Sequence, residues 1–196
     1  MLEALDYLGV FVFALSGALL ASRKGMDLFG FIVLALMPAI GGGTIRDIVL
    51  DVPVFWTLDK NYLLLTLIAA VLTFAGYRLI ERVKRPLVWF DAVGLSVFCV
   101  LGAAKTLQIT NDAVVAVVMG VVSAVAGGII RDVIANDPPM VLRSEIYATA
   151  AFLGALVYVG FVSFGLPWAE WAGVIAALAA RGSGIVFGWS LPRAGG

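Results

Sequence analysis

Histidine is absent from this 196-residue sequence, cysteine occurs once, and only 13% of the residues are charged. The missing histidine removes the most common metal ligand and the usual acid–base group at neutral pH. The single cysteine, Cys99, excludes an internal disulfide. Basic and acidic residues number 13 each, and the resulting zero net charge argues against nucleic-acid binding, which needs a basic surface.

The sequence also lacks the motifs of the common enzyme classes. It shows no nucleophile–base set, no P-loop and no cluster of metal ligands. We therefore expect that the protein is not an enzyme and that it binds no cofactor.

Apolar residues are what the sequence has in excess. They make up 62% of the chain, and the mean hydropathy is +1.06, whereas a soluble domain is about 45–50% apolar. We therefore expect an integral membrane protein. Its N-terminus is acidic rather than basic, which predicts that the first span is retained and not cleaved as a signal.

Seven segments are long enough to cross a membrane, which takes about 20 largely apolar residues in a helix. The predicted fold is an all-α integral membrane protein with a single membrane domain over residues 1–196. The predicted spans are about Tyr7–Ser22, Leu28–Leu50, Tyr62–Leu79, Leu87–Leu107, Ala113–Ala135, Ser144–Phe164 and Trp168–Phe187.

The distribution of lysine and arginine predicts the orientation. Loops that alternate across the membrane place Arg46, Lys60 and Lys105 on the side of the N-terminus and the other ten basic residues on the opposite side. We therefore expect the N-terminus outside and the C-terminus in the cytoplasm.

A Gly-Gly-x-x-Arg-Asp motif occurs twice, at residues 42–47 and 127–132, and the two copies lie 85 positions apart (46 to 131). The same shift aligns Asp6 with Asp91, Pro53 with Pro138 and Tyr62 with Tyr147. Each half holds three spans, an odd number, so the second half enters the membrane from the opposite face. This predicts an inverted repeat, with repeat 1 at about 6–80, repeat 2 at about 91–164 and an extra helix at about 168–187.

Each copy of the motif tolerates two unfavourable features inside a membrane. Glycine costs roughly 1 kcal/mol in a helix interior, and a charge at the bilayer centre costs about 2.5 kcal/mol or more. Inverted repeats place their sites on helices that glycine or proline interrupts. We therefore expect spans 2 and 5 to be kinked, or to be two half-helices each, with carbonyls exposed to a cation. We expect Arg46 to pair with Asp132, or Asp47 with Arg131, across the two-fold axis.

The candidate pore or kink residues follow from the motif: Gly41, Gly42, Gly43, Thr44, Arg46, Asp47, Gly127, Gly128, Arg131 and Asp132. The hydroxyls of Ser16 and Ser123 are further candidates for the pathway. A purely structural alternative stays open, in which the glycines form a close-packing surface and the Arg-Asp pair reaches the membrane interface.

Other charged and aromatic residues have simpler interpretations. Lys105 is either a pathway or gating charge or, as the sequence favours, a side chain that extends outward towards Gln108. Arg181 is predicted to be an interface anchor, and Trp56 part of an interfacial aromatic belt. The basic set Arg78, Arg82, Lys84 and Arg85 is predicted to attract anionic lipids.

With these motifs, the sequence resembles the prokaryotic branch of the trimeric intracellular cation (TRIC) channel family, whose bacterial members are also catalogued as glycine transporters. The resemblance extends from Asp6 to Pro192. It implies a homotrimer in the prokaryotic inner membrane, with a pore in each subunit between the kinked second and fifth helices. The implied ion is monovalent, chiefly potassium, and no other metal is implied. Lys105 resembles the gating lysine of the animal branch.

Three functions remain open on the sequence alone. The first is a potassium-permeable channel. The second is a secondary transporter of glycine or a similar zwitterion, with the carboxylate on a half-helix N-terminus and the amine on Asp47 or Asp132. The third is a membrane scaffold without a pathway.

Overall fold

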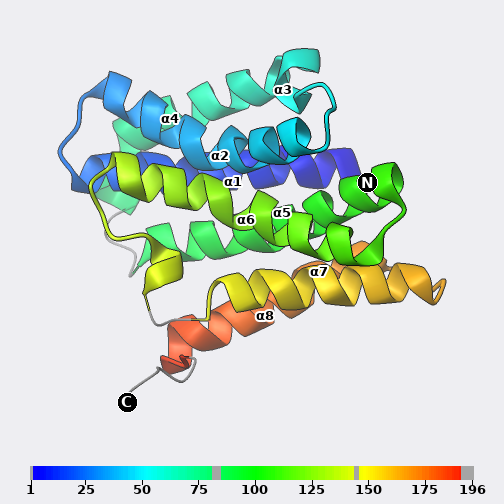
Figure 1. The fold of residues 1–196 in the computed structure, drawn as a ribbon. Coiled ribbons are helices and arrows are strands. Elements are labelled where there is room, and N and C mark those ends of the chain that lie inside the picture. The colour runs from blue at the N-terminus through cyan, green and yellow to red at the C-terminus, as the bar shows by residue number, and fades with distance from the viewer. Residues whose placement is uncertain (1, 81–84, 144–145, 191–196) are drawn as a thin grey trace.

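The computed structural model describes residues 2–80, 85–143 and 146–190, and within these ranges the protein is helical without strands (Figure 1). The helices in chain order are α1 (Leu2–Arg23), α2 (Leu28–Val49), α3 (Phe55–Leu58), α4 (Asn61–Ile80), α5 (Pro86–Thr110), α6 (Ala113–Ile134), α7 (Ala148–Ser163) and α8 (Ala169–Phe187), with a 3₁₀ turn, η1, at Met140–Leu142.

Six of the described helices are long and apolar enough to cross a membrane: α1, α2, α4, α5, α6 and α8. The prediction of a multi-pass, all-α membrane protein is therefore confirmed. Helix α7 has only 16 residues, so a seventh span stays a prediction. The fourth predicted span is longer than expected, because α5 continues to Thr110 and ends only where Asn111 adopts a left-handed conformation.

The two halves begin their central helices in the same way. Asp27 accepts a hydrogen bond from the backbone N–H of Gly30 at the start of α2. Asp112, 85 positions later, accepts from the N–H groups of Val114 and Val115 at the start of α6. Side-chain caps of this kind satisfy backbone donors that have no partner within the helix. Equivalent residues of the two halves thus form equivalent local structure.

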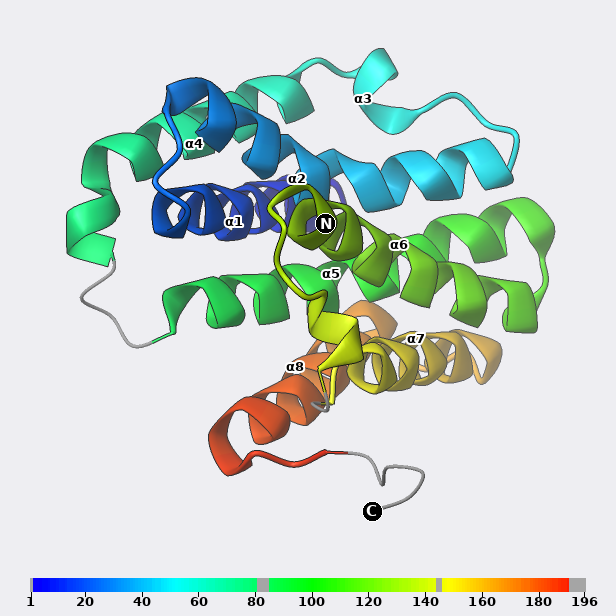
Figure 2. The same ribbon diagram turned by 60° about the vertical axis from the view of Figure 1, so that its left-hand side comes forward.

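The helices form two bundles that cross at α2 and α6. Helices α1, α2 and α4 pack together, as do α5, α6 and α7, and α8 packs on α5 and α7. Figures 1 and 2 show α2 and α6 side by side and running in opposite directions. The C-terminal ends of α2 and α6, which contain the two motifs, therefore lie at opposite ends of the molecule.

The glycines of the motifs permit the crossing of α2 and α6. A Cβ atom on Gly42 would lie 2.0 Å from the Ser123 carbonyl oxygen, and one on Gly127 would lie 2.8 Å from the Pro38 carbonyl oxygen. Both helices are continuous α-helices through these positions. The alternative of two half-helices each is therefore wrong, and the glycines serve the close packing that the structural alternative predicted.

Candidate functional site

The first motif is part of a charged cluster at one end of the bundle, which we call the first cluster: Asp6, Arg46, Asp47, Tyr62 and Lys105. Arg46 Nε donates a 2.8 Å hydrogen bond to Oδ1 of Asp47. Lys105 Nζ of α5 donates a second 2.8 Å bond to the same oxygen. Asp47 is fully buried, while the Lys105 side chain is 33% exposed. One carboxylate therefore joins α2 to α5.

Asp47 also holds the connection that follows α2. Its Oδ2 accepts a 2.9 Å bond from the backbone N–H of Phe55, and its carbonyl oxygen accepts from the N–H of Val52. Thr44 supports the same segment, because its hydroxyl donates to the Ile40 carbonyl and accepts from Trp56 Nε1. Trp56 is thus bonded to α2, a contact that no sequence pattern indicated.

Two sequence predictions about this cluster are wrong. Arg46 pairs with the neighbouring Asp47 and not with Asp132, because α2 and α6 are antiparallel: the glycines of the two motifs meet at the crossing, and the Arg-Asp ends point away from it in opposite directions. Lys105 does not simply extend towards Gln108, because its ammonium group forms an ion pair with Asp47. The other interpretation of Lys105, a pathway or gating charge, stays a prediction.

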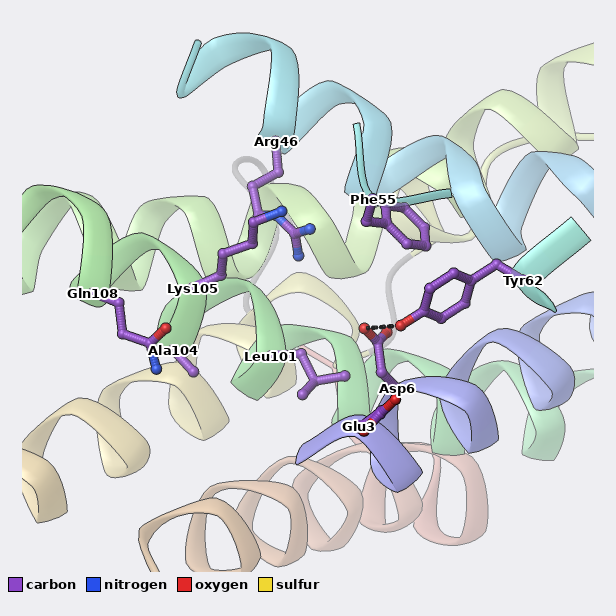
Figure 3. Close-up of a pocket in the computed structure, with 9 residues that line it drawn as sticks. All are labelled: Glu3, Asp6, Arg46, Phe55, Tyr62, Leu101, Ala104, Lys105 and Gln108. Carbon is purple, nitrogen blue, oxygen red and sulfur yellow. Dashed lines mark hydrogen bonds between the residues drawn. The ribbon is translucent and has the colours of Figure 1, made fainter. Parts of the chain in front are cut away.

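A cavity of about 340 Å³ opens beside the first cluster (Figure 3). Figure 3 shows the Arg46 guanidinium and the Asp6 carboxylate pointing into the same space from α2 and α1. Asp6 accepts a 3.0 Å bond from the Tyr62 hydroxyl. The lining residues are Glu3, Asp6, Arg46, Phe55, Tyr62, Leu101, Ala104, Lys105 and Gln108.

The second motif forms an equivalent cluster at the other end, which we call the second cluster: Ser16, Asp91, Arg131, Asp132 and Tyr147. Arg131 Nε donates a 2.8 Å bond to Asp132 Oδ1, as Arg46 does to Asp47. Asp132 Oδ2 accepts from the N–H of Met140, the repeat equivalent of Phe55. The local geometry of the motif is therefore duplicated.

The second cluster is closed where the first is open. Arg131 Nη1 donates a 2.7 Å bond to Asp91 Oδ1 and a 2.9 Å bond to Ser16 Oγ. Arg131, Asp91 and Ser16 are all 0% exposed. This one guanidinium thus joins α6 to both α5 and α1. In the first cluster, the equivalent Asp6 forms no ion pair with Arg46.

The remaining candidates have packing roles. Gly43 lies against the Phe55 ring, Gly128 against the Tyr147 hydroxyl, and Gly41 is in ordinary contact with Ile130. Ser123 is buried against Gly102 of α5 and belongs to neither cluster.

Comparison with known proteins identifies the family to which the chain belongs. A family model described as "Glycine transporter" matches residues 3–78 and again 88–163. A UPF0126 membrane protein of Vibrio cholerae is 45% identical over 98% of this chain and 82% of its own. The inner membrane protein YadS of Escherichia coli is 43% identical over 96% and 93%.

A solved structure decides which family this is. The TRIC trimeric intracellular cation channel orthologue from Rhodobacter sphaeroides aligns with a TM-score of 0.92 and 46% identity, over 96% of this chain and 98% of its own. The chain belongs to the TRIC channel family. The resemblance seen in the duplicated motif is thereby confirmed.

Helix α8 of this TRIC protein lies outside the two matched segments, yet it contacts the second cluster. Arg181 of α8 is only 1% exposed, and its Nη1 donates a 3.1 Å bond to the carbonyl oxygen of Ile146. Its guanidinium carbon lies 5.1 Å from the centre of the Tyr147 ring. The prediction of an interface anchor is wrong, because the side chain points inward.

The basic set that the sequence assigns to lipids is described only in part. Arg78 and Arg85 are exposed, and Arg82 and Lys84 lie outside the described residues. Asp6, Asp91, Tyr62 and Tyr147 were not among the predicted site residues. Their identity across the 85-residue shift was the signal that could have identified them.

Proposed function

We propose that this TRIC protein is a cation channel permeable to potassium, with one pore in each subunit of a homotrimer. The observation on which this rests is a pair of charged clusters inside an apolar molecule, with a charged cavity beside the first cluster and a fully buried second cluster. Its relative from Rhodobacter sphaeroides is a trimeric cation channel with the same fold.

The proposed pore runs from the first cluster, along the crossing of α2 and α6, to the second cluster. Glu3 and Asp6 line the cavity at its mouth and attract cations. The positive charges of Arg46 and Lys105 are partly neutralised there by Asp47. In this proposal, the close backbone approach at Gly42 and Gly127 is the narrow part of the pore.

The second cluster is the closed gate in this proposal. Arg131 bonds to Asp91, Asp132 and Ser16 in a site without solvent exposure, so no ion passes while these bonds hold. Opening requires Arg131 to leave Asp91, which separates α6 from α1 and α5. We place the first cluster outside and the second in the cytoplasm of a prokaryotic cell, with the protein in the inner membrane.

The test is single-channel recording from purified protein in planar bilayers under a potassium chloride gradient. We expect discrete openings that reverse near the potassium potential. The double variant Asp47→Asn/Asp132→Asn should lose them, because it removes two carboxylates and leaves the positive charges of Arg46, Lys105 and Arg131 less neutralised along the proposed pore, where they repel cations. The matched control is Asp27→Asn/Asp112→Asn, which changes the two helix caps to another good capping residue.

A second candidate function is a secondary transporter of a small zwitterion. The observation that favours it is the contrast between the accessible cavity beside the first cluster and the fully buried second cluster, together with the glycine transporter model that matches both halves. A silent bilayer, with saturable glycine uptake into liposomes from the same preparation, would replace the channel by the transporter.

A further inference from the structure

The connection that follows α6 is held to the first bundle by ion pairs at the surface. Lys24, in the turn after α1, has its Nζ 3.4 Å from Oδ1 of Asp137 and donates a 3.3 Å bond to the carbonyl oxygen of Asn136. Arg143, directly after η1, pairs with the other oxygen of Asp137 and donates a 3.0 Å bond to the carbonyl oxygen of Pro138. One carboxylate thus lies between two cations. We call Lys24, Asp137 and Arg143 the strap.

The same connection is bonded on its inner side to the second cluster. The carbonyl oxygen of Asp132 accepts a 2.8 Å bond from the N–H of Asp137, and its Oδ2 accepts a 2.9 Å bond from the N–H of Met140. Oδ1 of Asp132 pairs with Arg131, the arginine of the proposed gate. Residues 137–140 therefore link the strap to the carboxylate that pairs with Arg131.

The equivalent connection of the first half has the same bend without the strap. Both connections turn at a residue in the left-handed conformation, Asp51 with a φ of 53° and Asn136 with a φ of 49°. In both, the next residue donates its N–H to the carbonyl oxygen of the motif aspartate. The repeat equivalents of the three strap residues are apolar: Ile109, Val52 and Leu58. The strap is thus an addition to one half, and the bend itself does not require it.

Dissolved salt reaches the strap but not the ion pairs of the gate. The side chains of Lys24, Asp137 and Arg143 are 31%, 29% and 45% exposed, whereas Arg131 and Asp91 are fully buried. The Debye length falls from about 10 Å at 0.1 M salt to about 3 Å at 1 M, and buried pairs are screened much less than exposed ones. A rise in ionic strength therefore weakens the strap and leaves the pairs of the gate intact.

We propose that the strap makes this TRIC protein a sensor of ionic strength on the side of the second cluster. The inference rests on the proposed function, in which opening separates α6 from α1. The pair between Lys24 and Asp137 joins the end of α1 to the connection after α6, so it opposes this separation. At low ionic strength the strap holds the gate closed, and at high ionic strength the screened strap releases it.

Hydrogen–deuterium exchange of the purified protein tests the strap itself. Residues 135–143 should exchange about threefold faster in 1 M than in 0.1 M potassium chloride, as expected when an exposed ion-pair network is screened. Asp137→Asn should exchange fast at both concentrations, because it removes the charge that both cations share. Residues 50–58 are the internal control, since no ion pair is described there. Equal exchange of residues 135–143 at the two concentrations would overturn the strap.

Single-channel recording tests its effect on the gate. N-methyl-D-glucamine chloride, a salt of a large organic cation, raises the ionic strength on the side of the second cluster at constant potassium concentration. The open probability should rise about threefold. Lys24→Gln and Asp137→Asn should start from the higher value and lose most of the response to salt.

Two matched controls change the same charges outside the strap. Arg23→Gln removes an exposed cation next to Lys24 that forms no ion pair within the described residues, and Asp51→Asn removes a carboxylate from the equivalent connection. Both should respond to salt as the unaltered protein does. The same response in the controls and in the strap variants would overturn the sensor.

Exchange and current together separate this inference from the proposed function. Salt-sensitive exchange without current in any variant would overturn the channel and leave the salt-sensitive strap in place. Currents whose open probability does not depend on salt in the unaltered protein would overturn the sensor alone.

Discussion

At the scale of single residues, the second cluster depends on one arginine. The buried guanidinium of Arg131 contacts two carboxylates and the hydroxyl of Ser16. Removing one partner of a buried ion pair is strongly destabilising, by about 3–5 kcal/mol, because the other charge is left uncompensated. The hydroxyl is neutral, so it is the group that can be removed with the least damage to the fold.

Substitution Ser16→Ala should therefore favour opening of the proposed gate. It removes a hydrogen bond of 2.9 Å to a charged group, which is worth about 1.5–3 kcal/mol. We expect an increase in open probability of about tenfold in single-channel recordings. The control is Thr73→Val, which removes a buried hydroxyl that bonds only within its own helix, to Ala69. Equal open probabilities in the two variants would contradict the gate.

The sequence identified the charged residues of the two clusters, but it did not predict which of them bond to each other. The repeat identified Arg46, Asp47, Arg131 and Asp132, because charges inside apolar spans are conspicuous. It did not show that each arginine bonds to its own neighbour, since an arginine side chain is long enough to reach several partners. Lys105 has no equivalent charge in the other half, so the repeat contained no information about its contact with Asp47.

At the scale of helices, α2 and α6 approach each other through their glycines. The Gly42 position allows no Cβ atom, while a Cβ on the adjacent Gly41 would be 3.4 Å from its nearest neighbour, an ordinary contact. Six of the seven predicted segments agree with the six long helices of the described residues to within several residues, because apolar length defines them, and the other agrees with the shorter α7. Their continuity could not be predicted, since glycine is compatible both with a break and with a close crossing.

Gly42 and Gly41 allow a prediction in which one substitution is the control for the other. Gly42→Ala should lower the free energy of unfolding by about 1–3 kcal/mol or more, because the added methyl group overlaps the Ser123 carbonyl. Gly41→Ala should be neutral or stabilising by up to roughly 1 kcal/mol, from its better helix propensity. Thermal unfolding in detergent measures both. A Gly42→Ala variant as stable as Gly41→Ala would show that the crossing is looser than described.

Helix α8 contributes to the second cluster from outside the repeat. Arg181 stacks on Tyr147 and bonds to the Ile146 carbonyl. Arg181→Met keeps the length of the side chain but loses the cation–π contact, which is worth about 2 kcal/mol in a buried site. We expect a clear loss of thermal stability compared with Ser183→Ala, a substitution on the same helix whose hydroxyl bonds only to Ala180. Equal melting temperatures would leave Arg181 without a stabilising role.

At the scale of the whole molecule, the orientation stays a prediction, with the first cluster outside and the second in the cytoplasm. Native Cys99 is buried, so a cysteine introduced at an exposed position is the reactive one. Gln108→Cys, in the cavity, should react with a membrane-impermeant thiol reagent in intact cells. Arg23→Cys, exposed at the other end of α1, should react only after permeabilisation. The reverse pattern would place the N-terminus in the cytoplasm.

The first cluster is open to a cavity and the second is buried, and this difference has a consequence for ion flow. In the proposed pore, an ion that enters from the cavity side meets an open mouth with carboxylates, whereas one that enters from the other side meets a buried cluster whose charges are paired. The energy profile along the route is therefore steeper in one direction than in the other. For the proposed channel we therefore expect rectification: at equal and opposite voltages, the current in one direction should exceed the current in the other, because a few residues differ between the two similar halves.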